Sequence, residues 1–131
     1  MVVSPSWDFT SENYRISLLA HEVQHFADYR RYPKLEAADL EYRAKLVELI
    51  LAETMQRELL DAFAAQALPD RASPHAYASH WALARLREQL ATGDLLAVPR
   101  SQLREAAETL LRQHTQSLVV NGAATAQTAL P

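Results

Sequence analysis

Two histidines and a glutamate near the start of the chain have the residue types and the spacing of a metal-dependent hydrolase motif. His21, Glu22 and His25 form a His-Glu-x-x-His motif within a segment whose pattern predicts a helix over residues 11–32. Residues four apart on a helix are separated by about 40° around its axis, so both imidazoles can reach one metal ion. Zinc suits two neutral imidazoles, and Glu22 lies about 60° further round than His25, close enough to address a water on that ion. The spacing therefore favours hydrolysis with Glu22 as general base.

The same predicted helix has two different faces. Its apolar residues fall at about 140–260° from His21, whereas both histidines and Glu22 lie at about 0–100°. The apolar set comprises Ile16, Leu19, Ala20, Val23, Phe26 and Ala27. We therefore expect the apolar face to pack on the core and the opposite face to carry the metal. Asp28, one turn beyond His25, is predicted either to orient an imidazole or to form a surface salt bridge.

A catalytic zinc ion usually takes a third protein ligand, and the residues directly after His25 do not supply one. A glycine at position 28 with a histidine or aspartate at position 31 would indicate a ligand nearby, but these positions hold Asp28 and Arg31. The candidates are therefore carboxylates of the next predicted helix. They are Glu36, Asp39, Glu41 and Glu48.

Glu41 is our preferred third ligand. Ala37 and Ala44 flank it on the predicted helix, and small residues allow two helices to approach closely. Glu48 shares the face of Glu41 two turns further on and is the second choice. Glu36 falls in the first turn, where it can instead complement the helix dipole.

Composition limits the classes of protein to consider. The chain has 131 residues, 49% of them hydrophobic, with only two glycines, no cysteine and a net charge of −3. Abundant helix formers and scarce glycine favour a mainly helical fold without phosphate-binding loops. The absence of cysteine excludes disulfides and thiolate zinc ligands. Since no long run of like charge occurs, we expect no nucleic-acid partner.

The remaining pattern predicts about four helices in one domain over residues 1–122. After the first helix, we expect helices over residues 35–68 and 74–92 and a last one that begins at Pro99 or Ser101 and ends near residue 119, with a break near the middle of the longest. Val2–Ser4 can form at most a short edge strand, because Pro5 follows it. Residues 123–131 are small and polar, and we expect a loose tail.

The His21-Glu22-x-x-His25 motif, followed by a helix-borne Glu41, resembles the gluzincins, the thermolysin-like clan of zinc metallopeptidases. The resemblance covers about residues 10–48. It implies a compact zincin-like core, Zn2+ held by His21, His25 and Glu41, and Glu22 as the base and proton shuttle. Two features depart from the clan. Lys45 stands where members often carry a supporting aspartate, and the sequence before the first helix is too short for the usual sheet.

Peptide hydrolysis also needs a group that stabilises the oxyanion of the tetrahedral intermediate. The clan often uses a late histidine or tyrosine, and the candidates here are His75, Tyr77 and His80 at the start of the third predicted helix. Their structural alternatives are simpler: His80 can pack beside Trp81, and His75 can face solvent.

Two classes of function follow from these patterns. The first is a zinc metallopeptidase acting on a peptide or protein substrate. The alternative is a non-catalytic helical module that keeps a metal site for stability or partner binding. No apolar run is long enough for a membrane span, and the N-terminus lacks a signal-peptide pattern. We expect a soluble cytoplasmic protein with no cofactor besides zinc, compatible with being part of a longer protein or of an oligomer.

Overall fold

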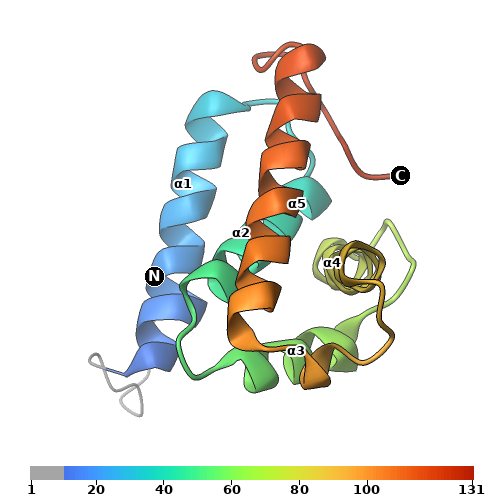
Figure 1. Cartoon of the computed structure of the whole chain (residues 1–131). Coiled ribbons are helices and arrows are strands. Elements are labelled where there is room, and N and C mark those ends of the chain that lie inside the picture. Colours follow the sequence, from blue (N-terminus) through green and yellow to red (C-terminus); the bar gives the residue numbers. More distant parts are fainter. Residues whose placement is uncertain (1–10) are drawn as a thin grey trace.

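The structure is a computed structural model, and it describes residues 11–131 (Figure 1). Its helical elements, in chain order, are η1 (Tyr14–Ala20), α1 (His21–Arg31), α2 (Ala37–Leu51), α3 (Gln56–Gln66), α4 (Pro74–Leu90), η2 (Leu95–Ala97) and α5 (Arg100–Val120). These residues form no strand, and the prediction of a mainly α fold is confirmed. The piece predicted as an edge strand, Val2–Ser4, lies outside the described residues. None of the helices within 11–131 is long and apolar enough to cross a bilayer.

The predicted helix over residues 35–68 consists of two helices, α2 and α3, which confirms the expected break. The break spans residues 52–55, where Ala52 takes an extended conformation. The Glu12 carboxylate accepts hydrogen bonds from the backbone N–H groups of Glu53 (2.7 Å) and Thr54 (3.0 Å). Backbone donors at the start of a helix need such acceptors, so Glu12 stabilises this corner and ties it to the start of the first helical segment.

Helix α2 is the centre of the fold. It packs against α1, α4 and α5, and α3 closes one end of the bundle (Figure 1). Because neighbours surround it, α2 is buried on nearly all sides rather than along one stripe. The main core lies between α2, α3, α4 and α5. Its most deeply buried large side chains include Tyr42, Leu46, Leu49, Leu86 and Leu103.

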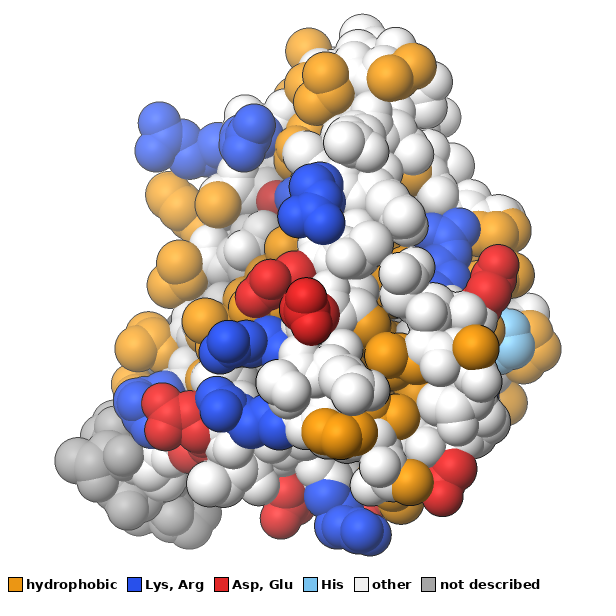
Figure 2. Space-filling model, in the orientation of Figure 1, with side chains coloured by type: hydrophobic (Ala, Val, Ile, Leu, Met, Phe, Trp, Pro, Cys, Tyr) orange, Lys and Arg blue, Asp and Glu red, His pale blue; other side chains and the backbone are white. Residues whose placement is uncertain are grey.

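The orientation of α1 differs from the prediction. Its apolar residues Leu19, Val23 and Phe26 are 44%, 60% and 66% exposed, and they form a hydrophobic row along one edge of the molecule (Figure 2). The histidine face is the one that packs on α2, and of the predicted apolar set only Ile16 is fully buried. The prediction assumed that burial follows hydrophobicity. It was wrong because α2 presents charged side chains to α1, and these attract the polar face.

The segment after α5 is also packed, contrary to the expected loose tail. Ala126 and Leu130 are buried, and the Gln127 carbonyl accepts a hydrogen bond from the Glu36 N–H (2.7 Å). The Ala129 N–H donates to the Asp39 carboxylate (2.7 Å). Two buried apolar side chains and these backbone bonds hold the segment against the start of α2.

Candidate metal centre

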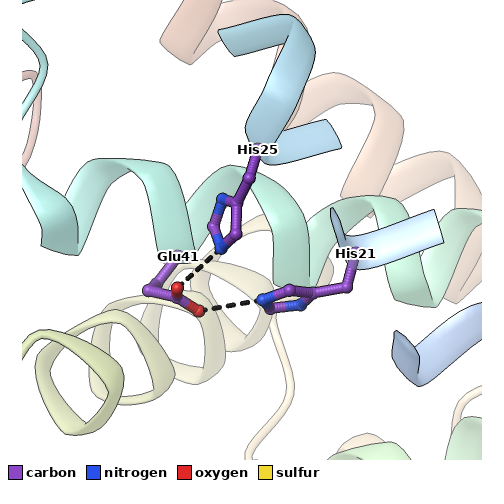
Figure 3. A group of neighbouring side chains, drawn as sticks. All are labelled: His21, His25 and Glu41. Carbon is purple, nitrogen blue, oxygen red and sulfur yellow. Dashed lines mark hydrogen bonds and ion pairs between the residues drawn. The ribbon is translucent and has the colours of Figure 1, made fainter. Parts of the chain in front are cut away.

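The two histidines of the motif and Glu41 come together between α1 and α2. His25 Nε2 lies 2.6 Å from Glu41 Oε1, and His21 Nε2 lies 3.2 Å from Glu41 Oε2 (Figure 3). One ligand atom from each of the three side chains lies within 4.8 Å of the other two. Tetrahedral zinc ligands at about 2.1 Å from the ion lie about 3.4 Å apart, so small side-chain movements suffice to hold a metal ion here.

A second carboxylate supports His21 from behind. His21 Nδ1 lies 2.8 Å from Glu48 Oε1, so the ring nitrogen that does not face Glu41 is hydrogen-bonded as well. Such a bond fixes the ring orientation and leaves Nε2 available to a metal ion. Burial lowers the pKa of His21, but its bonds to the Glu41 and Glu48 carboxylates outweigh burial and raise this pKa to about 9. Without metal, His21 is therefore cationic at neutral pH.

Glu41 has the negative charge and the available oxygen that a metal ligand needs. Burial raises its pKa, but pairing with His21 and His25 more than offsets this and holds the pKa far below its usual range. Its Oε2 is buried and has two imidazole nitrogens at 3.1–3.2 Å, yet no well-aligned hydrogen bond reaches it. An anionic oxygen that faces imidazole nitrogens without a well-directed proton fits a site for a cation.

The other predicted ligands and supports have separate positions. Glu36 is half-exposed and pairs with Arg71 (2.7 Å), away from the histidines, so it is not a ligand. Asp28 is buried and accepts a hydrogen bond from Arg43 Nε (3.1 Å) rather than from an imidazole. Of the two roles predicted for Asp28, the salt bridge is therefore present, but it is buried rather than at the surface, and within residues 11–131 no hydrogen bond joins Asp28 to an imidazole.

The general-base candidate Glu22 lies on the exposed side of α1. Its side chain is solvent-accessible, and within residues 11–131 it has no hydrogen-bond or ion-pair partner. Glu22 follows His21 directly and therefore lies at the border between the histidine face and the exposed apolar row.

Of the three predicted oxyanion donors, His75 alone reaches the cluster. Its Nδ1 lies 3.1 Å from Glu41 Oε2. Tyr77 is buried elsewhere, where its hydroxyl donates to the Pro131 carbonyl. His80 packs edge-on against Trp81, with ring centres 5.2 Å apart. Tyr77 and His80 follow His75 by two and five residues, and the helical rotation turns them away from Glu41.

A buried polar network beside the cluster was missed by the sequence analysis. Arg43 contacts Asp28 on α1 and donates to Thr115 on α5 (3.0 Å), while His114 Nε2 lies 3.0 Å from Asp39 Oδ1. Burial lowers the pKa of His114 in spite of the Asp39 carboxylate. His114 is the fourth residue after Leu110 and the fourth before Leu118, both buried, and this apolar spacing was the signal that it is not a surface residue.

Lys45 is likewise buried rather than exposed. Its ammonium lies 4.9 Å from the centre of the Phe63 ring. Burial lowers its pKa, and the nearby Glu48 and Glu41 carboxylates oppose this effect. Lys45 thus lies close enough to the Glu48 and Glu41 carboxylates for their charges to act on its amine.

Comparison of the chain with protein-family models, with curated proteins and with solved structures finds no match. The function is therefore inferred from the geometry of the cluster.

Proposed function

We propose that this chain is a zinc-dependent metallopeptidase whose metal is held by His21, His25 and Glu41. The observation that carries the proposal is the convergence of the two motif histidines with one carboxylate from a different helix. Three protein ligands of this kind leave a coordination position for water, which is the arrangement of catalytic zinc.

Each residue of the proposed site has a role that its position supports. Zinc supplies Lewis acidity and lowers the pKa of bound water towards about 7. Glu22, exposed and unpaired among the described residues, would serve as the base that takes the proton of the attacking water and returns it to the leaving amine. Glu48 fixes the ring of His21. It would thereby take the supporting role that clan members often give to an aspartate at the position of Lys45.

A non-catalytic metal-binding module is the second candidate function. The side chains of His21, His25 and Glu41 are only 12–13% exposed, and no strand in residues 11–131 is available to align an extended peptide. Limited access is typical of structural metal sites, whereas catalytic sites keep an open position.

Replacement of the base separates the two functions. We expect Glu22→Gln to retain zinc and to lose hydrolysis of a peptide library by at least about a hundredfold, as befits a general base. Glu58→Gln, an exposed glutamate on α3, is the matched control and should behave as the unmodified protein. No hydrolysis by the unmodified zinc-loaded protein would favour the non-catalytic module. Equal hydrolysis by both variants would show that Glu22 is not the base.

A further inference from the structure

We propose that His75 is a fourth, displaceable protein ligand that closes the zinc site at rest. This inference rests on the proposed function, because it concerns the same metal ion. It deepens that function by naming a regulatory element: an imidazole on α4 that occupies the position needed by water.

The carboxylate of Glu41 is surrounded by three imidazoles rather than two. His25 Nε2 lies 2.6 Å from Oε1, while His21 Nε2 and His75 Nδ1 lie 3.2 and 3.1 Å from Oε2. His75 is thus as close to the carboxylate as the motif histidine His21. Among residues 11–131, the group whose ligand atoms all lie within 4.8 Å of one another holds His21, His25 and Glu41 but not His75, so the His75 ring has to move closer to reach the same cation.

The three imidazoles differ in how firmly they are held. The side chains of His21 and His25 are 13% and 12% exposed, and Glu48 also binds His21. His75 is 66% exposed and is the second residue of α4, directly after Pro74. The backbone of α4 is anchored by its packing on α2, whereas most of the His75 side chain already lies in solvent. His75 is therefore the ligand that can leave without disturbing the helices.

The number of protein ligands decides what the site can do. Zinc with four protein ligands is closed and structural, whereas three ligands leave a place for water and substrate. With His75 bound, the site is at rest; with His75 rotated away, one coordination position is open. This two-state arrangement explains how a cluster with little solvent access can still serve hydrolysis.

Nitrogen-15 NMR of the histidine rings in the full chain tests this proposal residue by residue, without an activity measurement. On addition of one equivalent of zinc, we expect large shifts for Nε2 of His21 and His25 and for Nδ1 of His75. His80 and His114 serve as internal controls that do not shift. In His75→Ala only the two motif histidines should respond, and zinc affinity should fall by at least about tenfold.

Different failures have different meanings. If His21 and His25 shift while His75 moves no more than His80, the fourth-ligand proposal is overturned and the proposed zinc enzyme stands. If none of the rings responds to zinc, both proposals fail. Turnover per bound zinc adds an independent criterion: His75→Ala should raise it, because the water position is then always open. A fall in turnover with unchanged ring shifts would instead show that His75 stabilises the oxyanion, and would overturn its role as a ligand.

Discussion

The two sides of α2 carry different kinds of side chain: one is mainly apolar, and the other presents carboxylates. Towards α4 and α5 it buries apolar side chains such as Leu46 and Leu49, which are fully inaccessible, and one polar network in which Asp39 and Arg43 contact His114. Towards α1 it presents Glu41 and Glu48, also buried, to the histidines of the motif. Burial of apolar surface stabilises the first interface at about 25 cal/mol per Å². Buried ion pairs of the second interface contribute little net stability, because desolvation of the charges offsets their attraction.

This contrast explains why α1 exposes its apolar face and buries its polar face. Leu19, Val23 and Phe26 are exposed (Figure 2), whereas the imidazoles on the other face of α1 meet the Glu41 and Glu48 carboxylates. A helix placed for stability alone would bury its apolar face. The comparison of the two interfaces shows that the larger apolar core lies between α2, α4 and α5, whereas the α1–α2 interface holds the ionisable side chains of the candidate metal centre.

The largest effect is expected from a cavity in the apolar core. Leu86→Ala should lower the free energy of unfolding by about 2–5 kcal/mol, because Leu86 is fully buried in the main cluster. Urea unfolding followed by circular dichroism measures this loss, which should be the same with and without zinc. A loss below about 1 kcal/mol would mean that the core is not where the stability resides.

Zinc should stabilise the α1–α2 interface and raise the free energy of unfolding by a similar amount. At free zinc a thousandfold above its dissociation constant, we expect a gain of about 4 kcal/mol in unfolding free energy. His25→Ala should abolish the gain, and His80→Ala, which changes a histidine outside the cluster, should keep it. Thermal melting with zinc and with a chelator measures both variants, and an equal gain for the two would contradict the placement of the metal.

The pH dependence should have opposite sign in the two metal states. The pKa of His21 is raised from 6.5 to about 9, so its contribution to the metal-free protein is fully present below pH 6.5 and is lost as the pH rises towards 9. Zinc needs the neutral ring, so the zinc-loaded protein should instead gain stability over the same range. Melting temperatures between pH 6 and 9 measure both trends. At pH 7.5, calorimetry in buffers of different ionisation enthalpy should detect about one proton released from His21 per zinc bound.

The smallest effect is expected on the exposed face of α1. Val23→Ser and Phe26→Gln should each change the unfolding free energy by no more than about 0.5 kcal/mol, because both side chains are mostly in solvent. Urea unfolding measures the change. A cost above about 1 kcal/mol for either variant would show that this row is covered in solution and would weaken the contrast between the two interfaces.

The fold class and part of the candidate site could be predicted because both depend on patterns within single segments of the chain. Helical spacing alone places His21 and His25 side by side, and helix formers with few glycines indicate a mainly α fold. Glu41 was preferred over other carboxylates from its small neighbours, and it is the one that the structure brings to both imidazoles.

The remaining features depend on tertiary partners that no local pattern contains. Two of these features are contacts between distant residues: Asp28 pairs with Arg43, fifteen residues on, and His75 approaches Glu41 on another helix. The third is the exposure of Phe26, which depends on which face of α1 packs against α2. Hydrophobicity wrongly predicted which face of α1 is buried, because it does not record that the facing helix carries charges.

Isothermal titration of the metal-free protein with zinc is the most direct test of the central claim that the α1–α2 interface is a metal site. The account predicts one zinc per chain, a loss of affinity of at least about a hundredfold in Glu41→Gln, and a smaller loss, of about 10–100-fold, in Glu48→Gln, which removes only a supporting bond. No binding by the unmodified chain, or a greater loss in Glu48→Gln than in Glu41→Gln, would contradict it.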